Sequence, residues 1–238
     1  MVEIAVLVVN INNLAYTSNV INDLLVQDCE FKLTVVDQGS TEINTREYLD
    51  FLCELDRINV IRNKTNVNLN TLWNKFYCET EEPYLCFLNN DVRVPRNFLK
   101  DTLDIFGKEK DVGATIHATN HPNYQRTSDL RYVILKERIV QGWDFTIRRE
   151  DYTVIPDDLK VFGGDDWLFV QMYRKARKVA MILSSPIIHY NARSRRYYNG
   201  NRREEINALM KHGIERLSYV SKYTKRNPRF EKIVEEGI

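Results

Sequence analysis

The sequence predicts an α/β protein with a mostly parallel central sheet flanked by helices, and three observations lead to this fold class. Short apolar, β-branched runs alternate with segments in which apolar residues recur at helical spacing. Three of the runs stop abruptly at polar loops. With 43% hydrophobic and 28% charged residues, the 238-residue chain has the composition of a globular protein that can bury a core.

The first half of the chain supplies the regular alternation. Strands are expected over 3–9, 31–36, 58–61 and 84–88, and helices over 17–27, 45–55 and 70–79. Each helix has one apolar face, as Leu72, Trp73 and Phe76 illustrate in the third.

The second half is less regular. Strands are expected over 112–116 and 178–188, a β-like segment over 131–140, and a basic amphipathic helix over 202–220. No repeat or linker is visible, so we expect one domain over 1–238. Within it we expect a regular half (1–115), a less regular half (116–200) and a basic helical tail (201–238).

Polar side chains follow three of the predicted strands. They lie at Asn10 to Asn13, Asp37 to Ser40 and Asn89 to Asp91. Asn and Asp are common in turns, so one such loop is explained by chain reversal alone. Three at the carboxyl edge of one parallel sheet indicate a ligand site, because that edge is where such sheets bind ligands.

Two further groups carry possible chemistry. Asp165 and Asp166 follow a glycine pair and precede a helical pattern, where acids commonly stabilise the helix N-terminus. In a cleft, one of them could instead take a proton from a substrate hydroxyl. His189 ends a strand, where a hydrogen-bonded structural role is the usual alternative to metal binding.

Asp91 and His189 together are too few for a zinc site. They suit Mg²⁺ or Mn²⁺, whose remaining ligands would be waters and substrate phosphates. The sequence holds no P-loop and no GxGxxG motif that would cradle a diphosphate through backbone amides. These observations favour a diphosphate that is held through a metal ion rather than by backbone amides.

The order of motifs resembles the family 2 glycosyltransferases with the GT-A (Rossmann-like) fold, particularly rhamnosyltransferase-like members. Similar segments are VLVVNINN, TVVDQGSTE, NKTNVNLNTLWNKF, YLCFLNNDVRV, GWDFTIRRE and FGGDDWLFVQMYRKARKVAMI. The resemblance covers about residues 3 to 190, and it implies that 1–115 form the nucleotide-sugar-binding half and 116–200 the acceptor and catalytic half. Asn68 stands where the family has Gly, and Asn89-Asn90 replaces the first carboxylate of a strict DxD motif.

The resemblance implies an inverting, divalent-metal-dependent transferase that moves a sugar from a nucleotide-diphosphate sugar, UDP-sugar favoured, to a saccharide or glycolipid hydroxyl. Asp91 falls on the metal-binding Asp and His189 on a metal-binding His. Asp166 falls on the catalytic base, with Asp165 beside it. The implied nucleotide-binding residues are Asn10, Asn12, Asp37, Asn66, Asn74, Asn89 and Asn90.

Basic residues gather near the end of the chain. Residues 171–230 hold 15 Lys/Arg against 3 Asp/Glu, whereas 1–170 hold 18 against 27. Arg193, Arg195 and Arg196 could close over the diphosphate, grip an anionic acceptor or form a solvated lead-in to the helix. Arg interleaved with Tyr also suits DNA, so a transferase acting on hydroxymethylated DNA bases is an alternative.

A third hypothesis is a catalytically silent nucleotide-sugar or nucleic-acid binding module.

We also expect no signal peptide and no transmembrane segment, because no apolar window is long enough. The four cysteines show no CxxC pairing and are expected to be reduced core thiols. A cytoplasmic location, with peripheral contact at a membrane surface as a variant, is the corresponding expectation.

Overall fold

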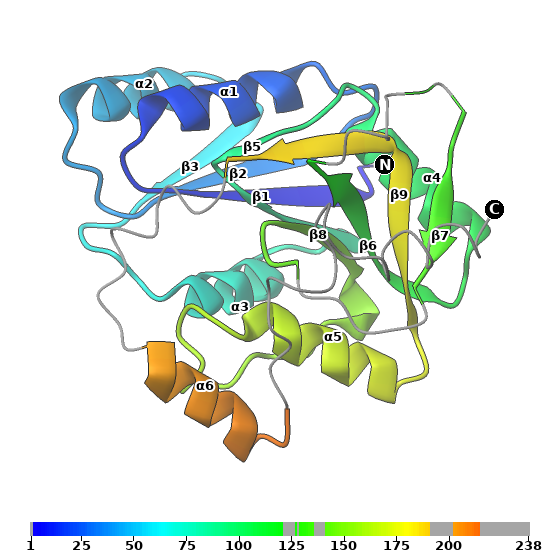
Figure 1. The fold of residues 1–238 in the computed structure, drawn as a ribbon. Helices are drawn as coiled ribbons and strands as arrows, with labels where there is room; N and C mark the ends of the chain where they lie inside the picture. The colour runs from blue at the N-terminus through cyan, green and yellow to red at the C-terminus, as the bar shows by residue number, and fades with distance from the viewer. Residues whose placement is uncertain (1, 121–126, 128, 136–140, 191–201, 215–238) are drawn as a thin grey trace.

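The computed structural model describes residues 2–120, 127, 129–135, 141–190 and 202–214 (Figure 1). In chain order the elements are β1 (Ile4–Asn10), α1 (Leu14–Leu25), β2 (Lys32–Asp37), α2 (Ile43–Cys53), β3 (Ile58–Arg62), α3 (Leu69–Glu79), β4 (Tyr84–Asn89), β5 (Val92–Arg93), α4 (Phe98–Lys108), β6 (Val112–Thr119), β7 (Tyr132–Ile134), β8 (Asp144–Arg148), the 3-10 turn η1 (Arg149–Asp151), α5 (Gly164–Arg174), β9 (Lys178–His189) and α6 (Arg202–Lys211).

The described strands form one sheet in the order β3-β2-β1-β4-β8-β6-β9-β5, with β7 paired to β9. Strands β1 to β4 run parallel to one another, and β6 runs parallel to β9. Strand β8 lies between β4 and β6 and is antiparallel to both. The predicted α/β fold class is confirmed, and the sheet is mixed rather than purely parallel.

Helices cover both faces of this sheet (Figure 1). On one face, α1, α2 and α4 bury Leu24, Leu49 and Phe98 against the even-numbered side chains of β1. On the other, α3 and α5 bury Trp73 and Phe169 against the aromatic side chains of β4 and β8. The sheet is thus the middle of three layers, and its carboxyl edge stays available for a site.

The regular first half follows the sequence closely, since every expected strand and helix there lies within three residues of its predicted bounds. Helix α4 is absent from the sequence-based expectation, although Phe98, Thr102, Ile105 and Phe106 are buried at helical spacing. The antiparallel strand β8 also lies outside it, because alternation along a strand does not reveal strand direction.

The C-terminal helix and the cysteines differ in part from the sequence-based expectation. Helix α6 begins at Arg202 as predicted but ends at Lys211, before a turn in which Gly213 has a left-handed backbone (φ 70°). The predicted continuation over 212–214 is therefore wrong, and 215–220 lie outside the described residues. All four cysteines are free, but only Cys86 is fully buried, and Cys53 and Cys78 are exposed rather than core thiols. No helix in the described part is long and apolar enough to cross a membrane.

Candidate functional site

The ends of β1, β2 and β4 carry a buried network that we call the strand-end cluster: Asn10, Thr17, Asp37, Ser40 and Asn90. The Asn10 amide donates to Asp37 Oδ1 (3.1 Å) and Ser40 Oγ (3.2 Å). Asn90 donates to Thr17 Oγ1 (3.0 Å). In-register pairing of β1 with β2 places Asn10 beside Asp37, so the sheet itself brings these groups together.

The neighbouring asparagines shape the loops around this cluster. Asn12 has a left-handed backbone (φ 52°), and its side-chain oxygen accepts the amides of Thr41 and Glu42 at 2.8 and 3.0 Å. Asn89 ends β4 and donates its backbone amide to the carbonyl of Trp143 (2.9 Å). Five of the seven predicted nucleotide-binding residues, Asn10, Asn12, Asp37, Asn89 and Asn90, therefore lie at one edge.

The other two lie further along the chain, before and within α3. Asn66 is exposed on the loop before α3. Asn74 uses its amide to hold a distant segment, donating to the carbonyl of Ile155 (2.8 Å) and accepting from Tyr152 Oη (3.0 Å). Contact of either residue with a nucleotide stays a prediction.

Asp91 and His189 meet although nearly a hundred residues separate them. Strand β5 pairs with the end of β9, and Val92 lies opposite His189 in the register. Asp91 Oδ1 lies 3.4 Å from His189 Nε2, and both residues are buried, with 1% and 6% exposed. The separation is longer than an ordinary N–H···O hydrogen bond.

This pair fits a metal ion that is completed by other ligands. Neither ring nitrogen of His189 makes a hydrogen bond to any part of the chain that is described, although the ring is buried. A carboxylate and an imidazole are accepted ligands of Mn²⁺ and Mg²⁺, which normally keep several water or phosphate oxygens. Among the described residues no group of three or more His, Cys, Asp or Glu could hold a metal alone.

Asp165 and Asp166, the acid pair, occupy the first turn of α5. They are 9% and 1% exposed, and the helix N-terminus favours their negative charge. Gly163 precedes the helix with φ 82°, a backbone conformation that side chains disfavour. The expected glycine-hinged loop before a helix is confirmed, and either acid remains a candidate base.

Helices α3 and α6 hold the loop that leads into the acid pair. The buried carboxylate of Glu205 accepts the backbone amides of Val161 (2.8 Å) and Phe162 (2.6 Å). The Asn70 amide donates to the carbonyl of Leu159 (3.0 Å) from the opposite side. A Cβ on Gly163 would lie 2.3 Å from Leu209 Cδ1, so α6 packs directly onto this glycine.

A short segment, 141–144, links the acid pair to the Asp91–His189 pair. A Cβ on Gly142 would lie 3.0 Å from Asp165 Oδ2, so the backbone there touches the acid pair. The next residue, Trp143, stacks on His189 with ring centroids 4.9 Å apart. The acid pair and the Asp91–His189 pair therefore lie on either side of the 141–144 segment, at the same edge of the sheet.

The segment is anchored by a buried polar cluster of Gln141, Asp144 and His117. His117 Nδ1 lies 3.2 Å from Asp144 Oδ2, and the Gln141 amide donates to the other Asp144 oxygen. Burial raises the pKa of the Asp144 carboxyl, and the contacts with His117 and Gln141 partly oppose that rise.

Several of these residues escape sequence reasoning. Glu205 has a faint signal, because it is one of three acids in the basic 171–230 segment. His117 and Asp144 have none, since a single His in an apolar strand and a single Asp before one are common. Arg193, Arg195 and Arg196 lie outside the described residues.

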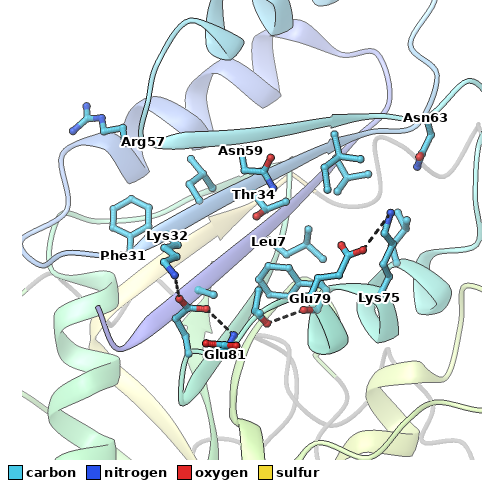
Figure 2. A pocket seen from close by; sticks show the side chains of 18 of the residues that line it. Leu7, Phe31, Lys32, Thr34, Arg57, Asn59, Asn63, Lys75, Glu79 and Glu81 are labelled. Atoms are coloured by element: carbon cyan, nitrogen blue, oxygen red, sulfur yellow. Dashed lines mark hydrogen bonds and ion pairs between the residues drawn. The ribbon is translucent and has the colours of Figure 1, made fainter. Parts of the chain in front are cut away.

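A cavity of about 590 Å³ lies elsewhere, between α3 and the face of β1, β2 and β3 that α3 covers (Figure 2). Leu7, Thr34 and Asn59 line its strand side, and Lys75 and Glu79 border it from α3. None of the predicted site residues within the described part lines it. We therefore place the candidate site at the strand ends, where the polar chemistry is, and not in this cavity.

Comparison with known protein families agrees with the motif order. The model of glycosyl transferase family 2 matches residues 5–169. The chain belongs to this family. The match is to family 2 as a whole, so the rhamnosyltransferase-like subgroup stays a prediction. A search of curated proteins finds no match.

Solved structures show the same fold. Residues 1–349 of S. aureus TarS in complex with UDP-GlcNAc superpose with a TM-score of 0.68 at 15% identity, covering 98% of this chain and 71% of that one. GalNAc-T7 with UDP, GalNAc and Mn²⁺ gives 0.66 at 14% identity, covering 87% and 47%.

This chain spans only part of several matched proteins. It covers 61% of another TarS 1–349 chain, and 41% of a longer TarS chain with a TM-score of 0.65. At such low identities the likeness establishes the GT-A fold.

Proposed function

We propose that this family 2 domain is a divalent-metal-dependent glycosyltransferase that uses a nucleotide-diphosphate sugar, with UDP as the favoured nucleotide, and inverts the anomeric configuration. The observation that carries the proposal is the meeting of Asp91 and His189 beside the strand-end cluster. The matched TarS and GalNAc-T7 structures, which contain UDP or UDP-GlcNAc, support the choice of donor.

The strand-end cluster is suited to hold the nucleotide. Its amides and carboxylate are pre-ordered by mutual hydrogen bonds, so little conformational freedom is lost on binding. Asp37, at the end of β2, is 4% exposed and would contact the base or ribose from the rim of the network. Asn89 would face the diphosphate side.

Asp91 and His189 would hold Mn²⁺ or Mg²⁺. When bound, the ion would neutralise charge on the departing diphosphate. The two side chains come from different strands whose pairing fixes their separation. That rigidity presents two ligands without requiring a third from the described protein.

The acid pair would serve the acceptor. The acceptor hydroxyl oxygen would bond to the anomeric carbon while the bond from that carbon to the diphosphate oxygen breaks. The hydroxyl proton would pass to the carboxylate of Asp166, with Asp165 beside it. One displacement from the opposite face inverts the anomeric configuration. The acceptor would be a saccharide or glycolipid hydroxyl.

A donor screen tests the proposal. Wild-type protein and Asp91→Asn would be incubated with UDP-, GDP- and dTDP-sugars, with Mn²⁺ or with EDTA, while free nucleoside diphosphate is measured. We expect release from a UDP-sugar that needs both Mn²⁺ and Asp91. If no donor is cleaved and calorimetry detects no nucleotide binding, the assignment is wrong.

The roles within the acid pair need a separate comparison. Asp166→Asn should abolish transfer yet leave UDP binding intact, whereas Asp165→Asn should retain measurable transfer. Equal loss in both variants would contradict the assignment of Asp166 as the base. Product anomers resolved by NMR would report inversion. The DNA alternative depends on arginines outside the described residues, and no described contact favours it.

A further inference from the structure

Trp143 occupies the centre of the candidate site and contacts three of its strands. Its ring lies almost parallel to His189, with an interplanar angle of 12° and centroids 4.9 Å apart. Its carbonyl accepts the amide of Asn89 (2.9 Å). The indole Nε1–H donates to Thr119 Oγ1 (3.1 Å) at the end of β6. The orientation of this indole is therefore fixed at its face, its edge and its backbone.

The stacking contact has a specific consequence for His189. An imidazole binds a metal ion through a nitrogen lone pair in the plane of the ring, so a stacked neighbour blocks ring rotation without covering either nitrogen. The His189 backbone is fixed too, since its amide donates to Asn120 Oδ1 (3.0 Å) and its carbonyl accepts the Asn120 amide (2.8 Å). Because the backbone of His189 is fixed, rotation of the imidazole ring is the main movement that a neighbouring side chain can restrict.

The segment that carries Trp143 is firmly anchored. Gln141 and Asp144 flank it and are 3% and 0% exposed. Asp144 Oδ2 also accepts the backbone amide of His117 (3.0 Å), and the Gln141 amide donates to the carbonyl of His117 (2.9 Å). The stack against His189 thus starts from a rigid part of the sheet.

We propose that Trp143 is a positioning residue that fixes the imidazole plane of His189 toward Asp91, with Thr119 fixing the indole in turn. This inference rests on the proposed function, because it assigns His189 to a metal ion. It goes beyond that function by naming a side chain that tunes metal affinity without touching metal or substrate. Removal of a side chain that orients a metal ligand typically weakens metal binding about 10- to 100-fold.

The test measures Mn²⁺ affinity directly, by the paramagnetic resonance signal of free Mn²⁺ in the presence of UDP, and not through turnover alone. Trp143→Ala removes both the stack and the hydrogen bond, and we expect roughly 10- to 100-fold weaker Mn²⁺ binding. Trp143→Phe keeps a stacking ring but loses the N–H donor. Thr119→Val removes the acceptor with little change of shape.

Thr119→Ser is the matched control, because it keeps the hydroxyl that accepts the indole proton. We expect Thr119→Ser to bind Mn²⁺ like wild type and Thr119→Val to bind a few-fold more weakly, with Trp143→Phe similar to Thr119→Val. If Trp143→Ala does not fold by circular dichroism, these last three variants still decide the matter. Saturating Mn²⁺ should restore most of the turnover in each folded variant.

The outcomes separate this inference from the function on which it rests. Unchanged Mn²⁺ affinity in folded Trp143→Phe, Thr119→Val and, where it folds, Trp143→Ala would overturn the positioning role while leaving the transferase intact. Failure of the wild-type protein to bind Mn²⁺ with UDP would instead remove the metal site, and this inference with it.

Discussion

The strand-end cluster and the acid pair are positioned in opposite ways. Asn10 and Asp37 end β1 and β2, and Asn90 directly follows β4, the other neighbour of β1 in the sheet. Asn10 hydrogen-bonds to both of the others. Asp165 and Asp166 depend on support from elsewhere, through Asn70 of α3, Glu205 of α6 and the 141–144 segment.

The two sites are therefore specified by different parts of the sequence. A site at the ends of parallel strands is specified largely by the strands, because pairing in register aligns their last residues. A helix N-terminus beside that sheet is placed only when distant segments dock onto the loop before it. Substitutions in the two regions should therefore affect different properties.

The largest effect is expected at the sheet edge. Asp91→Asn keeps the shape of the side chain but loses its charge, and we expect UDP-sugar turnover to fall at least about 100-fold, because metal stabilisation of a leaving diphosphate contributes several kcal/mol. Asp50→Asn is the control and should retain full turnover, because the Asp50 side chain is exposed on the outer side of α2. Similar rates for wild type and Asp91→Asn would show that the sheet edge is not the reactive site.

On the acid-pair side, Gly163→Ala should destabilise the fold. The left-handed backbone and the approach of Leu209 Cδ1 to 2.3 Å from a new Cβ together should cost about 2 kcal/mol of unfolding free energy. Gly107 in α4 has open space around it, so Gly107→Ala should stabilise by about 0.5–1 kcal/mol. Urea denaturation measures both, and equal shifts would contradict the packing of α6 on Gly163.

Glu205→Ala tests the same docking from the α6 side. Two partly buried backbone amides would lose their acceptor, which should cost about 2 kcal/mol and speed hydrogen exchange at Val161 and Phe162. Glu204→Ala is matched because Glu204 is exposed on the same helix. Unchanged exchange at these two amides in Glu205→Ala would remove α6 from the support of the acid pair.

The smallest expected effect is a difference in local unfolding between the loop before the acid pair and strand β4. Cys86 lies on β4 beneath the strand-end cluster, and burial raises the pKa of its thiol to about 12, so a thiol reagent should reach it only when β4 opens. Low urea should speed amide exchange at Val161 and Phe162 before it speeds Cys86 modification. The exposed Cys53 and Cys78 should react at once as internal references. Parallel acceleration at Cys86 and at these amides would mean that the regions open as one unit.

Much of the fold and part of the site can be predicted from the sequence. Strand–helix alternation gives the parallel half, because burial on both faces produces the same apolar runs each time. The position of Asp91 at a strand end and the glycines before Asp165 are also visible as local patterns. The approach of His189 to Asp91 follows from the family resemblance, and the structure brings the two residues together.

The remainder depends on contacts between distant segments. Glu205 meets Val161 only through the docking of α6, and no local spacing encodes that. Trp143 stacks on His189 because β8 is inserted antiparallel between β4 and β6. Asn74 is the opposite case. It occupies a motif position that predicts nucleotide contact, but its side-chain amide binds the carbonyl of Ile155 in a distant segment.

The most direct test of the account is to locate the metal ion itself. Crystals of wild-type protein grown with UDP and Mn²⁺ would be measured near the manganese absorption edge. We expect one anomalous peak within coordination distance of Asp91 Oδ1 and His189 Nε2, next to the diphosphate of UDP. Bound UDP with no manganese peak at this pair, or with manganese held by other residues, would contradict it.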